Sequence, residues 1–408
     1  MPILVNLSVA LYLLTNLIFK GSHNIGAFLT ILLGLGYLVY QLITKQSNWR
    51  ANKTDKWLIA SFVFYFFTFL LSMFISDGRG RELDNPSRAV LVLPLLLLFY
   101  QFPLRFKMLL QILPISAFIA GIVALFQRAV LHYPKAFEHQ MHIQAGDIAI
   151  ALGLFSLIIA FYFAIEQQRT SSILCSIAGL FGIMASLLST ARGGWVGFPL
   201  LFIFILWIYR QYISKKFLLT ISSAVCVAIL VALFIPQTQI QQRIDVAKQD
   251  ITAYVEKNNG ATSLGARFDM WKSALLMAKE RPLLGWGSQG SMEQRKQQAE
   301  QHLVSPAIVI FEHAHNQYLD DLSKRGIIGL LALLAIFLVP LRYFTKYLKN
   351  SNLEIKTIAL LGSLHILSVM CYCISQGFFT HNSGSIFYFL ITIVFYSLLR
   401  NRLLSQSQ

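Results

Sequence analysis

Long apolar runs separated by short polar segments make up most of the chain. A helix crosses the roughly 30 Å hydrocarbon core of a bilayer with about 20 apolar residues, and about twelve runs approach that length. They are Ile3–Phe19, Ile25–Thr44, Trp57–Ser76, Arg88–Phe102, Met108–Gln127, Asp147–Ile165, Ser171–Leu188, Trp195–Tyr209, Phe217–Pro236, Ile327–Tyr347, Thr357–Ser375 and Ser385–Leu399. The pattern predicts an all-α integral membrane protein with about twelve transmembrane helices.

One long polar interval, residues 237–325, separates the ninth run from the tenth. Parts of it repeat apolar residues at helical spacing, and Arg281-Pro282 is typical of a helix end. The predicted helical stretches are Gln241–Val255, Arg267–Glu280 and Ser291–His302. We therefore expect three segments: helices one to nine in residues 1–236, a partly helical loop in 237–325, and helices ten to twelve with a short cytoplasmic tail in 326–408.

Lysine and arginine are unevenly shared between the two sets of short loops. With the N-terminus placed in the cytoplasm, the cytoplasmic loops hold sixteen of these residues and the opposite loops hold seven. Basic residues favour the cytoplasmic side in short loops, whereas long loops cross the membrane regardless of their charge. We therefore predict a multi-pass protein with both termini in the cytoplasm. Residues 237–325 then lie outside, which for a bacterial inner membrane means the periplasm.

The composition agrees with a membrane protein and argues against two other classes. Of 408 residues, 56% are hydrophobic and 13% are charged, whereas soluble domains average roughly 45–50% and 25%. The formal net charge of +16 is spread over short loops rather than gathered on one face, so we expect no nucleic-acid partner. All four cysteines lie in apolar runs, which is typical of helix packing and not of disulfides or zinc sites.

Arg192 lies in the short turn between the seventh and eighth runs, at the predicted outer membrane boundary. A cation at that depth is costly unless it faces a cavity or a partner. Gly193 and Gly194 follow with uncovered backbone N–H groups, so guanidinium and amides together could hold an anion. The alternative is an arginine that extends to the interface without a ligand.

The stretch 312–325 concentrates polar side chains directly before the tenth run. Its candidates are His313, His315, Asn316, Tyr318, Asp320 and Asp321. Histidine is suited to moving protons near neutral pH, so His315 is a candidate general base. Asn316 and Tyr318 could orient a substrate, and a carboxylate could orient an imidazole. His313 and His315 would not share a helical face, which argues against a two-histidine metal site. We expect no metal and no cofactor; a structural histidine is the alternative.

Four further candidates are marked by position. Arg267 begins a predicted helix, where backbone N–H groups also favour anions, although it could be a solvated loop arginine. Arg88 opens the fourth run, Asp147 opens the sixth, and His381 lies in the last outer loop. These ionisable groups at outer ends of spans could line one substrate cavity, or they could anchor their helices at the interface.

The order of these pieces resembles the O-antigen ligase family, within the larger O-antigen polymerase and ligase superfamily. The resemblance covers most of the chain and rests on Ala191-Arg192-Gly193-Gly194, a long outer loop, and His315-Asn316-Gln317-Tyr318-Leu319 before the next span. Some members carry adjacent histidines in this motif, whereas Ala314 separates the two histidines here.

The resemblance implies an activity and roles. Family members transfer a polysaccharide from undecaprenyl pyrophosphate to the lipid A-core of lipopolysaccharide, and they require no nucleotide or metal. By resemblance, Arg192 and Arg267 would bind the pyrophosphate, and His315 would activate the acceptor hydroxyl. The expected partners are therefore the lipid-linked glycan, the lipid A-core acceptor and membrane lipids.

Three other activities remain open. An O-antigen polymerase uses the same donor with a second lipid-linked repeat as acceptor; the long loop before the tenth run favours a ligase. Protein O-oligosaccharyltransferases often carry extra soluble sequence after the spans, where this chain has only Asn401–Gln408. Transporters and flippases often place ionisable residues at mid-membrane, whereas here they gather at one predicted face.

Overall fold

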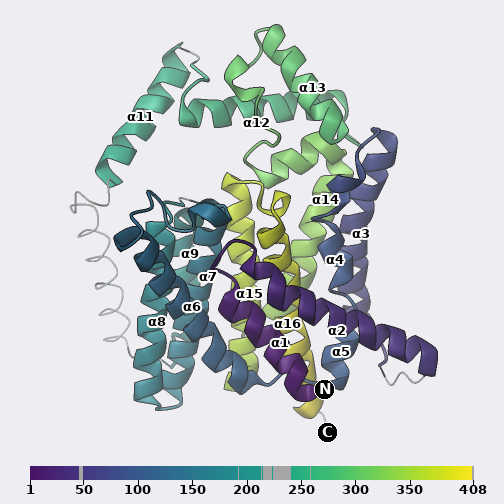
Figure 1. Ribbon diagram of the computed structural model, residues 1–408, viewed down its shortest axis with the longest axis vertical. Helices are drawn as coiled ribbons and strands as arrows, with labels where there is room; N and C mark the ends of the chain where they lie inside the picture. Colours follow the sequence, from purple (N-terminus) through teal and green to yellow (C-terminus); the bar gives the residue numbers. More distant parts are fainter. Residues whose placement is uncertain are drawn as a thin grey trace. The chain divides into compact units, whose positions relative to one another are not determined.

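The computed structural model describes residues 1–45, 49–191, 193–212, 214, 223, 240–257 and 259–406, with only the backbone at 240–244. Every regular element within these residues is a helix (Figure 1), which confirms the predicted all-α class. Among the described residues, eight helices are long and apolar enough to cross a membrane. They are α2 (Ser22–Thr44), α3 (Lys53–Ile75), α6 (Phe106–Ala129), α7 (His142–Ile165), α8 (Arg169–Leu188), α14 (Gln317–Thr345), α15 (Leu353–Ser375) and α16 (Asn382–Gln406).

Other apolar runs form shorter helices. These are α1 (Pro2–Thr15), α4 (Ser87–Leu91), α5 (Leu95–Gln101) and α9 (Gly193–Tyr209). The predicted single helix Arg88–Phe102 is wrong: the chain forms α4 and α5 because Pro94 lacks a backbone N–H and its ring obstructs a continuous helix. The predicted run Phe217–Pro236, apart from Ser223, and Arg192 lie outside the described residues. The total of about twelve spans therefore stays a prediction.

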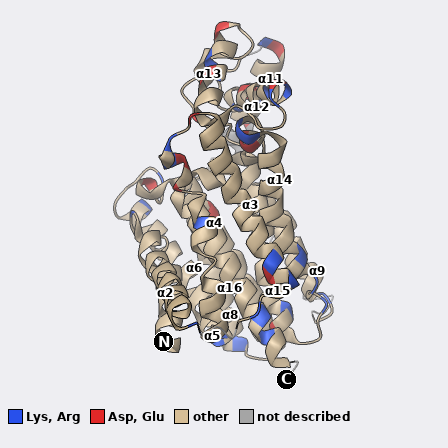
Figure 2. Ribbon diagram, turned by 90° about the vertical axis from the view of Figure 1, so that its right-hand side faces the viewer, with Lys and Arg blue, Asp and Glu red and all other residues tan. Residues whose placement is uncertain are grey.

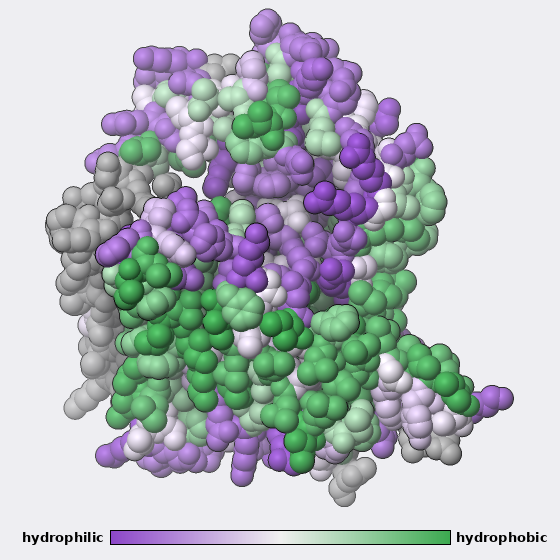
Figure 3. Space-filling view, viewed as in Figure 1, coloured by the Kyte–Doolittle hydropathy of each residue, from purple (hydrophilic) through white to green (hydrophobic). Residues whose placement is uncertain are grey.

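The chain forms two compact units. Unit 1 consists of Met1–Leu70, Gly80–Ile205 and Ala332–Gln408, and unit 2 consists of Leu71–Arg79 and Leu206–Leu331. The innermost helix of unit 1 is α16: 89% of its most apolar stretch is buried, against 28% for α2. Figure 3 shows hydrophobic surface along α6 and α8 between hydrophilic ends. Apolar side chains on the outside of a helix bundle are what a lipid environment requires.

Helices α7 and α8 of unit 1 pack with their backbones unusually close. A Cβ atom added to Gly182 would lie 2.8 Å from the Cα atom of Gly153, and one added to Gly153 would lie 2.9 Å from the carbonyl oxygen of Gly179. Small residues at such crossings let apolar helices gain van der Waals contact in a membrane. This packing holds α7, whose first turns carry the candidate Asp147, against α8.

One end of unit 1 carries both chain termini and a cluster of charge (Figures 1 and 2). There the buried carboxylate of Asp55 pairs with Arg400 at 3.0 Å and accepts a hydrogen bond from the Tyr396 hydroxyl at 2.7 Å. Arg402 pairs with Glu354 nearby. A buried carboxylate is tolerated only when it is paired and hydrogen-bonded, so this network joins the start of α3 to the end of α16.

Unit 2 contains the helices of the polar interval. These are α11 (Ile240–Lys257), α12 (Ser263–Glu280), α13 (Gly287–Glu300) and the 3₁₀ helix η4 (Pro306–Ile308). A small core of Ala266, Met270, Ala299, Val304 and Ile308 joins α12, α13 and η4, with Trp271, Val309 and Phe311 packed against it. Helix α12 ends at Glu280 as predicted, but it begins four residues earlier than predicted because Thr262 caps its first turn.

Helix α14 is interrupted at Gly326, where the backbone turns to φ 61° and ψ −160°. The turn before α13, residues 281–286, packs against α14 at this break. Ile327 donates its N–H to the Pro282 carbonyl at 2.8 Å, and Trp286 donates its N–H to the Ser323 carbonyl at 3.0 Å. A Cβ atom on Gly326 would lie 2.3 Å from the carbonyl carbon of Leu283. The polar stretch 317–325 is thereby separated from the apolar stretch that follows, and the predicted span beginning at Ile327 starts directly after this break.

Candidate functional site

Arg267 lies half-buried at the start of the second turn of α12, so it does not begin the helix as predicted. The helix begins at Ser263 because the Thr262 side chain accepts a hydrogen bond from the Gly265 N–H at 3.1 Å. Two residues after Arg267, the buried Asp269 accepts hydrogen bonds from the Tyr254 hydroxyl at 2.8 Å and the Ser305 N–H at 2.7 Å. The start of α12 is therefore fixed from α11 and from the segment before η4, so the position of Arg267 is defined.

Trp271 links α12 to the predicted catalytic motif. It follows Arg267 by four residues, so the two side chains leave the same face of the helix. The Trp271 indole N–H donates to the Ala314 carbonyl at 3.1 Å, between the two histidines. The face of α12 that carries Arg267 therefore contacts the segment that carries His315.

We call residues Phe311–Asn316 the histidine loop, and side chains from three helices hold its backbone. Besides Trp271 from α12, the α14 residues Lys324 and Asp320 bind it: Lys324 donates to the Glu312 carbonyl at 2.8 Å, and Asp320 accepts from the Ala314 N–H at 3.0 Å. Lys324 and Asp320 are themselves a buried ion pair at 2.9 Å. Charged groups buried in this way are costly unless every bond is made, so the loop backbone is tightly specified.

Arg295 of α13 is the third anchor, and the sequence analysis did not identify it. Its side chain is fully buried, and one guanidinium nitrogen donates to the Phe311 carbonyl. Its Nε and second Nη atoms have no hydrogen-bond partner among the described residues. Burial lowers the pKa of the Arg295 guanidinium, while the charge of Asp320 opposes the shift. Burial of an arginine with few hydrogen-bond partners costs desolvation free energy. The hydrogen bond of Arg295 to the Phe311 carbonyl is therefore retained at a cost to stability, which indicates that it serves to hold the histidine loop.

The two histidines of the loop lie in edge contact, with ring centroids 4.2 Å apart. His315 is half-buried and has φ 49°, in the left-handed region that residues other than glycine rarely occupy. Its backbone N–H donates to the Nδ1 atom of His313 at 3.3 Å. The Phe311 ring also lies against the His315 ring, with centroids 5.5 Å apart. His315 is thus held by its backbone and by two neighbouring rings.

Asn316 and Tyr318 begin α14. The Asn316 side-chain oxygen accepts hydrogen bonds from the backbone N–H groups of Tyr318 at 3.0 Å and Leu319 at 3.2 Å, which caps the helix. The cap explains why the helix starts directly after the histidine loop. Substrate binding by Asn316 or by the half-buried Tyr318 stays a prediction.

The other candidates lie in unit 1, at the start of α7 and α9. The buried Asp147 carboxylate accepts hydrogen bonds from the Gln376 side-chain amide and from the Gly194 backbone N–H. A Cβ atom on Gly193 would lie 2.6 Å from the Ser375 hydroxyl oxygen, so the start of α9 passes close to the end of α15. The amide of Gly194 thus binds a carboxylate of the protein itself, and Asp147 anchors the start of α9.

Arg88 and the last outer loop come together in unit 1. The Arg88 Nε atom donates to the Asn382 side-chain oxygen at 3.3 Å, directly beside the half-buried His381. Asn382 in turn donates to the Asn24 side-chain oxygen at 2.8 Å. The sequence marked Arg88 and His381 separately, and the fold makes them neighbours in a polar cluster that joins the ends of α2, α4 and α16.

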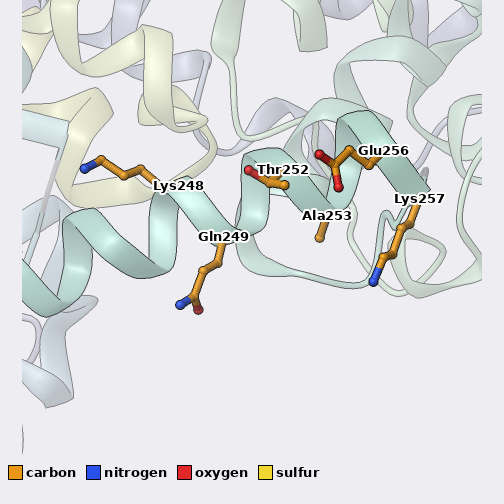
Figure 4. Close-up of a pocket in the computed structure, with 6 residues that line it drawn as sticks. All are labelled: Lys248, Gln249, Thr252, Ala253, Glu256 and Lys257. Atoms are coloured by element: carbon orange, nitrogen blue, oxygen red, sulfur yellow. The ribbon is translucent and has the colours of Figure 1, made fainter.

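Among residues 1–45, 49–191, 193–212, 240–257 and 259–406, no group of three His, Cys, Asp or Glu side chains is placed to hold a metal ion. The pocket in Figure 4 is lined only by α11 residues. They are Lys248, Gln249, Thr252, Ala253, Glu256 and Lys257. The pocket contains none of the candidate side chains.

Comparison with known proteins identifies a family model and a close relative. The family model described as O-antigen ligase matches residues 177–334, which include the Arg192 turn, Arg267 and the histidine loop. An uncharacterized protein of Haemophilus influenzae is 44% identical over 391 residues, which cover 96% of this chain and 97% of that protein. The matched region holds both motifs on which the sequence resemblance rested. The chain therefore belongs to the O-antigen ligase family.

Proposed function

We propose that the protein is an O-antigen ligase that transfers a polysaccharide from undecaprenyl pyrophosphate to a sugar hydroxyl of the lipid A-core at the periplasmic face of the bacterial inner membrane. The observation that carries the proposal is the histidine loop. It presents His315 from a backbone held by three helices, and one of them, α12, carries Arg267 one turn before the Trp271 anchor. Catalytic groups need this kind of fixed placement.

The chemistry assigned to these side chains is simple because the pyrophosphate is already a good leaving group. His315 accepts the proton of the acceptor hydroxyl, whose oxygen forms a bond to the anomeric carbon. The bond from that carbon to the pyrophosphate oxygen breaks, and undecaprenyl pyrophosphate leaves. Arg267 neutralises the developing negative charge, and Arg192 shares this role on the basis of its Arg-Gly-Gly motif. Attack from the back side inverts the anomeric configuration, which NMR of the product linkage tests.

The decisive assay is reconstituted transfer with a defined undecaprenyl-linked glycan and rough lipopolysaccharide. His315→Ala should lower the rate by about 10²–10⁴-fold, and Arg267→Ala by about 10²–10³-fold. Arg192→Lys should also transfer poorly, because lysine lacks the planar fork that binds two oxygens. Lys272→Ala, at an exposed position on the same helix as Arg267, is the matched control and should transfer normally. Normal rates for the His315 and Arg267 variants would refute the proposed site.

The lipopolysaccharide of a deletion strain separates the related activities. Loss of a ligase leaves lipid A-core without repeats, loss of a polymerase leaves a single repeat, and loss of a protein glycosylating enzyme leaves lipopolysaccharide unchanged. Transfer by purified protein without an ion gradient excludes a transporter or flippase. We favour the ligase because the long loop precedes the tenth predicted span and because the matched family model is described as O-antigen ligase.

A further inference from the structure

The backbone of His315 adopts a conformation that needs support. Its φ of 49° lies in the left-handed region, which residues with a Cβ atom rarely enter unless the surroundings hold them there. The contact that involves this residue's own N–H is the hydrogen bond to His313 Nδ1 at 3.3 Å. A ring nitrogen accepts a hydrogen bond only when it carries no proton. The observed geometry therefore requires neutral His313 with its proton on Nε2.

We propose that His313 is a positioning residue, whose neutral Nδ1 atom holds the backbone of His315 in the left-handed conformation and so aims the catalytic imidazole. The inference rests on the proposed function of His315 as the base, and it replaces the predicted role of His313 in binding substrate. Protonation of Nδ1 would set two N–H donors against each other and release the His315 backbone.

Burial favours the neutral form of His313 at neutral pH, and the surrounding charged groups act in both directions. Burial is the largest effect and lowers the pKa of His313 below its ordinary value. From α14, the Asp320 carboxylate raises this pKa and Lys324 lowers it; from α13, Arg295 lowers it; and within the loop, Glu312 raises it. Because the pKa is lowered, Nδ1 stays free to accept at pH 7. The hydrogen bond is lost only as the pH falls through the lowered pKa.

The spacing of this bond indicates which substitutions imitate it. A side-chain acceptor that binds the N–H two residues later is the usual geometry of an asparagine turn. The loop already contains one, from the Asn316 side-chain oxygen to the Tyr318 N–H at 3.0 Å. Asparagine at position 313 places its oxygen near the position of Nδ1, and it does not titrate. Glutamine is one methylene longer, so its amide extends toward the position of Nε2.

Two experiments test the inference with His313→Asn, His313→Gln and His313→Ala. In the reconstituted transfer assay, His313→Asn should keep kcat within about threefold of wild type. His313→Gln and His313→Ala should lose about 10- to 100-fold in kcat with little change in the KM for the lipid-linked donor, because the base is misplaced while the donor still binds. The acid limb of the kcat profile should be less steep in His313→Asn, in which only His315 still titrates.

The second experiment does not use activity. Nitrogen NMR of ¹⁵N-histidine-labelled protein, assigned with the same variants, reports which ring nitrogen of His313 carries the proton. An unprotonated Nδ1 at pH 7 supports the inference, whereas a proton on Nδ1 overturns it, as do equal rates for all three variants. If wild-type protein shows no transfer at all, the proposed function fails while the NMR result still decides the placement of the His313 proton.

Discussion

Removal of the Lys324 amine is the most informative change to the fold of unit 2. Lys324 is buried, 2.9 Å from the Asp320 carboxylate and 2.8 Å from the Glu312 carbonyl oxygen. Lys324→Met keeps a flexible apolar stem of similar length but leaves the buried Asp320 carboxylate without its ion-pair partner. Breaking a buried pair from one side destabilises a protein by about 3–5 kcal/mol. Since total stability is typically about 5–15 kcal/mol, the loss should be large.

The double variant separates lost charge balance from lost packing. Asp320→Asn combined with Lys324→Met removes both charges, and the asparagine oxygen still accepts the Ala314 N–H that binds the Asp320 carboxylate at 3.0 Å. The hydrogen bond from Lys324 to the Glu312 carbonyl is still lost, at about 1–3 kcal/mol, but no carboxylate is left buried without its partner. The second substitution should therefore restore part of the stability that the first removed. Lys279→Met, at an exposed position on α12, should change stability by no more than about 0.5 kcal/mol.

Denaturant unfolding of the four proteins in one detergent measures these differences, and hydrogen exchange reports the amides of the histidine loop. We expect Lys324→Met to speed exchange at residues 311–316 more than the double variant does. The reasoning is refuted if Lys324→Met is as stable as Lys279→Met, or if the Asp320 substitution adds a further loss instead of relieving one.

Three other changes have definite expected outcomes. Gly326→Ala should destabilise the protein by more than about 2 kcal/mol, because φ 61° is unfavourable and the added Cβ would lie 2.3 Å from the Leu283 carbonyl carbon; the melting temperature checks this. Trp271→Phe leaves the buried Ala314 carbonyl without its donor and should cost about 1–3 kcal/mol, with faster exchange in the histidine loop as the readout. Asp55→Asn leaves Arg400 buried without its partner and should cost about 3–5 kcal/mol in the same unfolding assay, whereas transfer by the protein that remains folded should be normal.

The fold was predictable where composition alone decides the structure. The change from polar to apolar residues at Gly326-Ile327 marked the start of a span, and a break in α14 lies there. The run Arg88–Phe102 was predicted as one helix because its hydropathy outweighed Pro94, although proline removes a helical hydrogen bond whatever its neighbours are.

The candidate site was predictable in its residue types but not in its support. The side chains that position the histidine loop bind its backbone atoms. Such contacts leave no recognisable motif in the sequence. In the sequence Arg295 looks like a solvated arginine, because its burial depends on tertiary packing, which its neighbours in the chain do not show. One signal was present: Gly287, Ser291 and Ala299 lie four or eight residues from Arg295 on one face of α13, and all are buried. Small residues at that spacing indicate a closely packed face, and an arginine among them belongs to the interior.

The break at Gly326 also bears on the order in which the protein assembles. The N–H groups of Ile327 and Ile328 take their partners from the carbonyls of Pro282 and Leu283, which are synthesised earlier. The carbonyls of Pro282 and Leu283 therefore gain these hydrogen bonds only after the following helix has formed. We therefore expect the loop that carries His315 to reach its final structure only after the helix that follows it has formed.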